Sequence, residues 1–259
     1  MPLTREHNAG MERRRDAVAR SAMFRGMPEA LIDHVVACSI ERRLDEGEVL
    51  FFKNDPGEFL GLVAQGRIYK ILYGPKGQEL ILDTIETDDT VDEMALVDGS
   101  PRSFTAMAYG PVSALLIPRR HFQPLLENPL LMQRVHSLLH ERFRRAVDSM
   151  EILCLHQLES RLARRMLSMM RGEAGARSGV VEVELPPTQS ILAAMVNVSR
   201  PKLNAQLQEW RRTGMISCHR NIVRIHDVDA LRGKAGLGRA HGASDEKSVP
   251  APIRVRMSF

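Results

Sequence analysis

The chain has 259 residues, of which 44% are hydrophobic and 26% are charged. This composition can bury one or two ordinary cores, so it excludes a disulfide-stapled miniprotein and a disordered chain. No apolar run approaches the roughly 18 residues of a membrane helix, and residues 1–15 are polar and basic, unlike a signal peptide. The three cysteines are odd in number and widely spaced, which fits a reducing compartment. We therefore expect a cytoplasmic protein of about two domains with no membrane partner.

The net charge of +4 is divided unevenly along the chain. Residues 1–158 carry 19 Lys and Arg against 23 Asp and Glu, whereas residues 159–232 carry 12 against 7 and residues 233–259 carry 5 against 2. A mildly acidic front and a basic back indicate that the back part binds a polyanion, for which nucleic acid is the leading candidate.

The first half of the chain changes its pattern near residue 40. Residues 11–38 predict short helices, one of them beginning at Pro28. Short apolar or alternating runs follow, separated by turns rich in Gly, Pro and Asp at 55–57, 65–66 and 74–77. The runs are Val49–Phe52, Phe59–Val63, Ile68–Tyr73, Leu80–Ile85, Phe104–Tyr109 and Val112–Ile117. Six short strands at this spacing predict an antiparallel sandwich or barrel rather than a parallel sheet.

After Pro129 the apolar residues recur at intervals of three and four, which predicts one long helix. They are Met132, Val135, Leu139, Phe143, Ala146, Met150 and Leu153. The stripe either packs on this chain's own β unit or pairs with a second copy. The charged opposite face, which includes Arg134 and Arg142, favours the second copy. A further helix is predicted near residues 155–170 and a loop over 172–179.

Residues 180–225 carry the strongest local pattern. A strand is predicted over 180–185, and Thr188 is a good N-cap for a short helix that ends near residue 196. After a tight turn, Ser199 is the N-cap of a second helix, so the two helices form a helix-turn-helix. Two short strands around 218–221 then predict a β-hairpin, the wing of a winged helix.

The N-terminal end of the second helix carries the candidate base readers. Arg200, Lys202 and Gln206 point away from its apolar side, and in a helix-turn-helix this end enters the major groove of DNA. There Arg reads guanine and Gln reads adenine. Three hydroxyls are expected on phosphates: Ser199, Thr188 and Ser190. A small helical domain with an ordinary solvated face would explain the helices, but not the wing, the caps and the basic excess together.

The order of β unit, long helix and winged helix resembles the Crp/Fnr family of bacterial transcription regulators. Residues Asp92–Ser103, DEMALVDGSPRS, look like the family's phosphate-binding cassette, G-E-x-A-L-L-x-G-x-P-R-S-A, and Val198–Leu203 look like its recognition helix. The resemblance covers nearly all of residues 20–230. It implies an α+β fold with a double-stranded β-helix (jelly-roll, cyclic-nucleotide-binding-like) domain at 1–128, a dimerisation helix at 129–154, a winged helix-turn-helix at 155–232, and a flexible basic tail at 233–259.

The resemblance also implies partners. Family members bind inverted-repeat operators in double-stranded DNA as homodimers, and RNA polymerase is a further partner if the protein is an activator. In the cyclic-nucleotide binders of the family, the cassette glutamate accepts from the ribose 2′-hydroxyl, and the arginine and the following serine hold the cyclic phosphate. By resemblance, Glu93, Arg102 and Ser103 form an effector pocket.

Three departures from the pattern argue against cyclic AMP as the effector. Asp92 replaces the cassette glycine and adds a negative charge where an anion should approach. Phe104 replaces a small residue after the serine. The positions that carry adenine-contacting hydroxyls in the cyclic-AMP branch fall on Ala146 and Val147. We therefore predict regulation without cyclic AMP, with Glu93 and Arg102 paired as a structural ion pair; the alternative is a regulator that depends on cyclic AMP or cyclic GMP.

Other cofactors and activities find little support in the residues. The iron-sulfur branch needs several N-terminal cysteines, but only Cys38 lies in the first 150 residues. His136 and His140 have a metal-compatible spacing, but no further ligand accompanies them or His121 in the sequence. We therefore expect neither haem nor a metal site. We find no nucleophile elbow, P-loop or paired-carboxylate motif and expect no enzyme. A cyclic-nucleotide sensor with catalytic or scaffolding output would share the β unit but not the winged helix.

Overall fold

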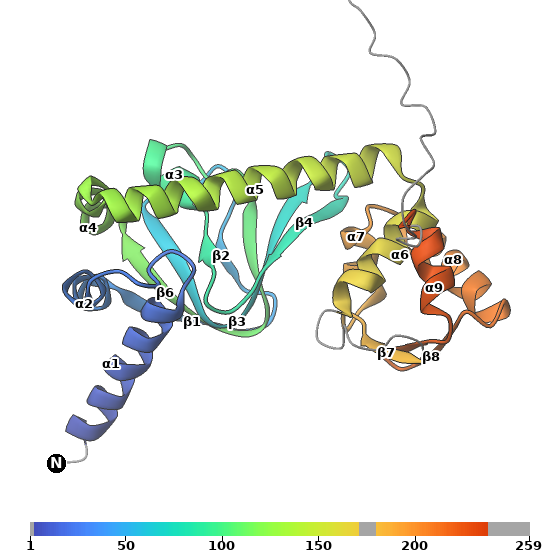
Figure 1. Ribbon diagram of the computed structural model, residues 1–259, viewed down its shortest axis with the longest axis horizontal. Helices are drawn as coiled ribbons and strands as arrows, with labels where there is room; N and C mark the ends of the chain where they lie inside the picture. The colour runs from blue at the N-terminus through green and yellow to red at the C-terminus, as the bar shows by residue number, and fades with distance from the viewer. Residues whose placement is uncertain (1–2, 171–179, 238–259) are drawn as a thin grey trace, which may run out of the picture.

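The computed structural model describes residues 3–170 and 180–237 as two units joined by the long helix α5 (Pro129–Leu155), which crosses the top of Figure 1. A six-stranded sheet with helices forms the first unit, and helices around a three-stranded sheet form the second. The expected α+β class is confirmed. The loop expected at 172–179 and the part of the expected tail at 238–259 lie outside the described residues.

The first unit is an antiparallel β-roll. Its sheet has the order β1-β6-β3-β4, while β2 pairs with β6 and β5 pairs with β3. The strands are β1 (Ile40–Leu44), β2 (Val49–Phe51), β3 (Phe59–Tyr73), β4 (Glu79–Ile85), β5 (Thr90–Val91) and β6 (Thr105–Pro118). The helices of this unit are α1 (Leu3–Arg20), α2 (Glu29–Cys38), α3 (Glu93–Asp98), α4 (Arg119–Phe122) and the 3-10 helix η1 (Gln123–Glu127).

Strands β3 and β6 each unite two of the strands predicted from the sequence. The turn expected at 65–66 is a bulge inside β3, where the pairing with β6 shifts on both sides of Gln65. Gly66 has a φ of +93°, and a Cβ at this position would lie 2.5 Å from the carbonyl oxygen of Pro111. Only glycine fits such a backbone, so the glycine that resembles a turn residue instead bends a continuous strand.

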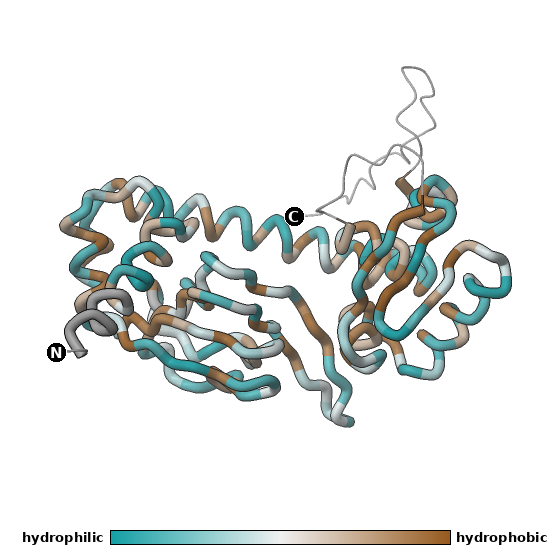
Figure 2. The backbone as a smooth tube through the Cα atoms, turned by 90° about the horizontal axis from the view of Figure 1, so that it is seen from below, coloured by the Kyte–Doolittle hydropathy of each residue, from teal (hydrophilic) through white to brown (hydrophobic). Residues whose placement is uncertain are grey.

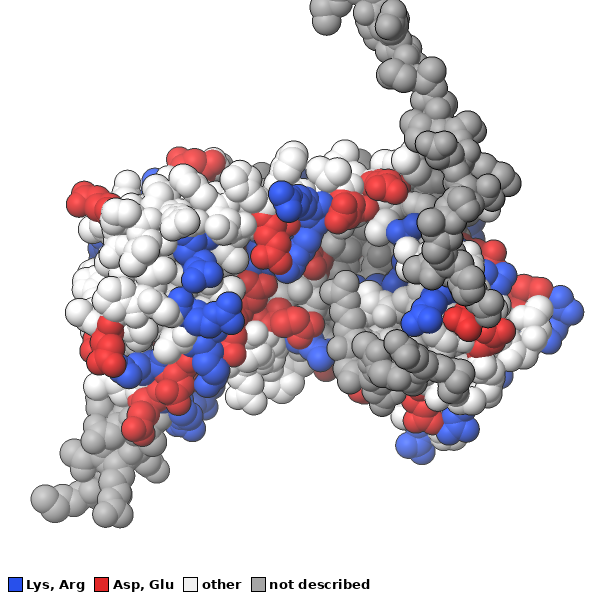
Figure 3. Space-filling model, viewed as in Figure 1, with Lys and Arg blue, Asp and Glu red and all other residues white. Residues whose placement is uncertain are grey.

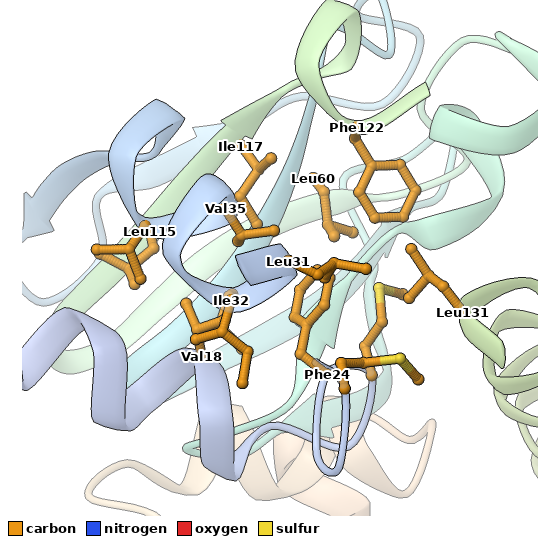
Figure 4. Close-up of a cluster of buried hydrophobic side chains, with 14 of the residues drawn as sticks. Val18, Phe24, Leu31, Ile32, Val35, Leu60, Leu115, Ile117, Phe122 and Leu131 are labelled. Atoms are coloured by element: carbon orange, nitrogen blue, oxygen red, sulfur yellow. The ribbon is translucent and has the colours of Figure 1, made fainter. Parts of the chain in front are cut away.

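The N-terminal helices pack against the β-roll and the start of α5 in one core. Figure 4 shows Phe24, Leu31, Val35 and Phe122 in this cluster, with Leu131 of α5 at its edge. Each of these five side chains is buried. At about 1.5–3 kcal/mol for each large apolar side chain, this burial stabilises the attachment of α2, α4 and α5 to the sheet.

The apolar stripe of α5 divides into a buried part and an exposed part, so packing on the chain's own β unit explains only the first, and pairing with a second copy stays a prediction. Leu131, Val135 and Leu138 are buried in the core of the β-roll. Farther along, Phe143 is 69% exposed and Met150 is 64% exposed. In Figure 2 the hydrophobic and hydrophilic residues alternate along this helix as it leaves the β-roll. The helix begins at a good cap, because the Asn128 side chain accepts from the backbone N–H groups of residues 130 and 131.

The second unit is a winged helix. It contains α6 (Leu158–Met169), β7 (Val181–Glu184), α7 (Gln189–Met195), α8 (Arg200–Arg212), β8 (Ile216–His219), β9 (Ile222–Ile225) and α9 (Val228–Lys234). Thr188 caps α7 as expected, since its Oγ1 accepts from the backbone N–H of Ile191. Ser199 stands at the N-cap of α8, but its side chain makes no cap hydrogen bond. The first hairpin strand continues to His219, the second spans Ile222–Ile225, and Arg220 and Asn221 form the turn.

The two units touch through α7. Ala194 of α7 is buried against Tyr69, Ile71 and Ile81 of strands β3 and β4. The ring of Tyr109 stacks on Tyr69 with centroids 4.8 Å apart, at the edge of the same cluster. The helix-turn-helix therefore rests on the β-roll through apolar contacts of its first helix. Across the described ranges, no helix combines the length and the apolar character needed to cross a membrane.

We predict that Leu203→Ala lowers the free energy of unfolding of the winged helix by about 2–5 kcal/mol, because Leu203 is completely buried and its loss leaves a cavity. Trp210 is the only tryptophan of the chain and lies in the same core, so denaturation followed by its fluorescence reports this unit. Gln208→Ala, on the exposed side of α8, should change the free energy of unfolding by no more than about 0.5 kcal/mol. Equal effects of the two variants would contradict this packing.

Candidate effector cassette and DNA-binding surface

The cassette lies between β5 and β6, where the chain turns sharply into the short helix α3. Asp92, directly after β5, has a φ of +60°, in the left-handed region that favours glycine. The side chain of Asp92 is only 3% exposed, so a carboxylate stands inside the cassette at the position of the family's glycine. The backbone thus keeps the conformation of a glycine while the side chain adds a charge.

Arg102 is the partner of this carboxylate. Its guanidinium is fully buried, and Nη1 donates to Asp92 Oδ2 at 3.3 Å while Nη2 donates to the Phe59 carbonyl at 2.6 Å. The group also lies against the rings of Phe51 and Phe59, at 4.2 and 4.5 Å from their centroids. Burial raises the pKa of Asp92, and the charge of Arg102 opposes that rise. Within the cassette, Asp92 supplies the anion that the buried arginine requires.

The expected ion pair between Glu93 and Arg102 is wrong. Glu93 instead accepts from the Thr90 hydroxyl and from Nη2 of Arg142, the latter at 3.2 Å. Glu93 follows Asp92 at the start of α3, so the two neighbouring carboxylates take different arginines. Separation along the chain does not distinguish the two carboxylates, because Asp92 and Glu93 are neighbours at nearly the same number of residues from Arg102.

Arg142 was expected on the charged outer face of the long helix, but it points into the cassette. Its Nη2 donates to Asp89, to the Thr90 carbonyl and to Glu93. Its side chain is 13% exposed. Although burial works against its charge, Glu93 and Asp89 together raise the pKa of Arg142 above its usual value. Arg142 therefore connects α5 to the loop and the helix that carry the cassette.

The remaining cassette positions differ in burial. Phe104 is buried, with the Lys70 ammonium 4.9 Å from the centroid of its ring and the centroid of the Phe51 ring 5.6 Å away. Burial lowers the pKa of Lys70, and the charge of Glu93 opposes this change. Ser103 is exposed, and it has no hydrogen-bond partner among the described residues. Ala146 and Val147 of α5 are exposed and present no polar side-chain atom.

The candidate base readers lie at the start of α8, as expected. Arg200 is the first residue of this helix, Lys202 is exposed, and Gln206 is half-buried one turn after Lys202. Arg200 and Lys202 have no ion-pair partner among the described residues, so both charges are available to a ligand. The hydroxyl residues Thr188, Ser190 and Ser199 are exposed at the starts of α7 and α8, where backbone N–H groups favour phosphates.

Arg220 is a candidate contact that the sequence analysis did not single out. It is exposed at the tip of the wing with a φ of +55° and without an ion-pair partner within the described ranges. Other arginines of this unit are neutralised, since Arg212 pairs with Glu209 and Arg224 pairs with Glu182. On the face drawn in Figure 3, basic and acidic side chains are mixed. For binding a polyanion, the net basic charge of this unit therefore matters less than the few arginines and lysines that have no acidic partner.

Two family models match the chain in the same order as these units. The model of the cyclic nucleotide-binding domain matches residues 41–128, and the model of the Crp-like helix-turn-helix domain matches residues 160–233. The chain belongs to the Crp/Fnr family of transcription regulators. The pairing of a cassette-bearing β-roll with a winged helix on one long helix is the architecture expected from the resemblance.

Known Crp/Fnr regulators are similar over most of the chain. A CRP-like cAMP-activated global transcriptional regulator of Mycobacterium tuberculosis is 23% identical over 221 residues, covering 85% of this chain and 99% of that protein. The cyclic AMP receptor protein of Thermus thermophilus is 24% identical over 212 residues, covering 82% and 95%. The structure of the c-di-GMP responsive regulator CLP of Xanthomonas campestris aligns with a TM-score of 0.67 at 19% identity, covering 77% of this chain and 100% of that one.

The recognition helix departs from the usual Crp/Fnr pattern. Family members often carry Glu directly after the arginine and a second arginine farther along, whereas this chain has Pro201 and Ala205. Pro201 fits the first turn of α8, because the backbone N–H groups there have no hydrogen-bond partner within the helix and proline lacks this group. The half-site read by the founding member of the family is therefore not carried over to this chain.

We predict that Arg200→Ala weakens binding to the specific operator by about 1–3 kcal/mol and leaves binding to random DNA nearly unchanged, as expected for an arginine that contacts a base. Fluorescence anisotropy on both DNAs measures the difference. Arg220→Ala is the comparison, because a phosphate contact at the wing should weaken both complexes by a similar amount. Equal losses on both DNAs for Arg200→Ala would assign it to phosphate.

Proposed function

We propose that this chain is a sequence-specific transcription regulator that binds an inverted-repeat operator as a homodimer and does not require cyclic AMP. The observation that carries the proposal is the Asp92 carboxylate on Arg102, the arginine that would hold a cyclic phosphate. The protein acts on DNA in the cytoplasm, and RNA polymerase is its further partner if it activates transcription.

A cyclic phosphate would meet an unfavourable charge in this cassette. Arg102 is already bound to Asp92 and to the Phe59 carbonyl, so a phosphate has to displace the carboxylate or lie beside it. Two like unit charges 4 Å apart repel by about 4 kcal/mol at an effective dielectric constant of about 20. Each 1.4 kcal/mol lowers affinity about tenfold, so this repulsion alone would weaken a micromolar ligand to about the millimolar range.

The sugar and the base of a cyclic nucleotide would also find few hydrogen-bond partners. Glu93, which by resemblance accepts from the ribose, is bound to Thr90 and Arg142. Phe104 is buried beside the Phe51 ring, and Ala146 and Val147 offer no hydrogen bond to a purine. An unpaired polar group of the ligand costs about 1–3 kcal/mol when buried.

The alternative is a regulator that depends on a cyclic nucleotide. It is favoured by the cassette residues Glu93, Arg102 and Ser103, by the names of the two cAMP-dependent relatives, and by the Nε atom of Arg102, which is buried without a hydrogen-bond partner. A nucleotide that displaced Asp92 could reach this atom. The similar structure named as c-di-GMP responsive indicates that this fold serves more than one effector.

The homodimer rests on the exposed part of α5. Phe143, Val147 and Met150 lie on one side of this helix and are 69%, 47% and 64% exposed. Such a stripe of large apolar side chains needs cover, and in a two-fold dimer the same stripe of a second copy supplies it. The two copies of α8 then reach half-sites about 34–36 Å apart, one turn of the DNA.

We predict that Phe143→Glu converts the dimer to a monomer, because it places a charge at the most exposed apolar residue of this stripe. Phe52→Glu is the matched control, since Phe52 is 57% exposed outside α5 and its substitution should leave the dimer intact. Light scattering at micromolar concentration measures the mass. Cys154 is exposed near the end of the same side of α5, so a short thiol cross-linker should join two native chains but not two Cys154→Ser chains. A monomeric native protein would contradict the proposal.

We predict no micromolar binding of cyclic AMP or cyclic GMP in calorimetric titrations, and an operator affinity that changes less than twofold when either is added. Asp92→Gly with Phe104→Ala is the comparison variant. It restores the small residues of the cassette pattern and leaves Arg102 without its carboxylate, so it should bind either nucleotide more tightly than the native chain. Micromolar binding by the native protein together with a tenfold gain in operator affinity would establish the alternative.

A further inference from the structure

The N-terminal helices bring together three side chains that commonly bind transition metals. His34 and Cys38 lie one turn apart on α2, and His121 lies on α4, far along the chain. One potential ligand atom from each residue lies within 4.8 Å of the other two. Cys38 and His121 are half-buried and His34 is exposed, so the cluster lies at the surface with one side open.

The packing beneath the cluster holds its two helices together. Leu31 and Val35 of α2 and Phe122 of α4 are buried in one core, and Figure 4 shows them converging there. The inward side of α2 is therefore fixed on the β-roll, and Cys38 lies at the end of α2 that faces His121. Since the helices are anchored by these apolar contacts, the cluster does not depend on a metal for its formation.

The distances suit a small tetrahedral cation after a modest closure. With bonds of about 2.3 Å to sulfur and about 2.0–2.1 Å to nitrogen, ligand atoms around Zn²⁺ lie about 3.3–3.6 Å apart. Side-chain movements of about 1 Å bring the three atoms to that separation. We propose that His34, Cys38 and His121 form a binding site for a zinc-like divalent transition metal, with water as the fourth ligand.

Cys38 and His121 each make one contact that a bound cation could replace. The Cys38 thiol donates to the Val35 carbonyl at 3.4 Å, and its proton is released to solvent when the thiolate binds the metal. Arg120 Nε donates to His121 Nε2 at 3.1 Å, and because Arg120 is exposed its side chain is free to move away. One thiolate and two imidazoles are a ligand set that favours zinc, cobalt or copper over magnesium or calcium.

The three residues of the site belong neither to the cassette nor to the candidate DNA-binding residues. The site joins α2 to α4, and η1 follows α4 directly and leads into α5. A bound cation would therefore bridge the N-terminal helices and the segment that begins the long helix. The sequence analysis predicted no metal site, because it weighed His121 with the histidines of α5 and not with α2.

Titration of the purified full-length protein with Co²⁺ tests the proposal, since this ion reports thiolate ligation and tetrahedral geometry in its absorption spectrum. We expect one Co²⁺ per chain with a thiolate-to-cobalt charge-transfer band, and displacement of Co²⁺ by Zn²⁺. Cys38→Ser should abolish the band. His34→Gln and His121→Gln should each weaken binding at least about tenfold. His34 is exposed, so its variant keeps the fold, which circular dichroism verifies.

Two controls use similar residues elsewhere in the chain. His136→Ala combined with His140→Ala removes a pair with the same one-turn spacing on α5, and Cys154→Ser removes an exposed thiol; both should leave the titration unchanged. The proposal is overturned if no charge-transfer band forms at saturating Co²⁺, if the band is lost with Cys154→Ser, or if both His34→Gln and His121→Gln bind Co²⁺ like the native protein.

Discussion

The buried guanidinium of Arg102 requires an anion from the rest of the cassette. Arg102 has no contact with solvent, and its charge lies between two phenylalanine rings where water cannot compensate it. Leaving such a charge unpaired would cost about 3–5 kcal/mol, so the fold needs an anion at this point. In a cyclic-nucleotide binder the ligand phosphate can fill that role. Here Asp92 fills it from within the chain, at a backbone conformation that an aspartate tolerates better than most residues.

The second arginine extends this arrangement to the long helix. Arg142 of α5 binds the Asp89 and Glu93 carboxylates, one on each side of Asp92 in the sequence. The cassette is therefore connected to the helix that also carries the exposed apolar stripe. The same helix leads to α6, the first helix of the winged-helix unit, so one element connects the cassette with the unit that carries α8. This linkage depends on charges of the chain itself, which is why our proposal needs no cyclic nucleotide.

The pattern of the sequence was enough to predict the architecture, but it did not predict which side chains pair inside it. The alternating runs, the caps and the helical stripe each follow from the chemistry of neighbouring residues, so the β-roll, α5 and the winged helix could be predicted. The bulge at Gly66 could not, because it depends on the approach of Pro111 from another strand. The partner of Arg102 and the inward turn of Arg142 depend on tertiary distances. The cluster of His34, Cys38 and His121 was missed for the same reason.

A double-mutant cycle between Asp92 and Arg102 tests the central claim most directly. Asp92→Asn and Arg102→Met each leave the other charge buried without its ion-pair partner, whereas the double variant leaves neither charge. The account predicts that the unfolding free energies of the two single variants fall by more in sum than that of the double variant, by at least about 1 kcal/mol. Operator affinity without nucleotide should follow the same order. Additive losses in both quantities would contradict the claim that Asp92 replaces a ligand on Arg102.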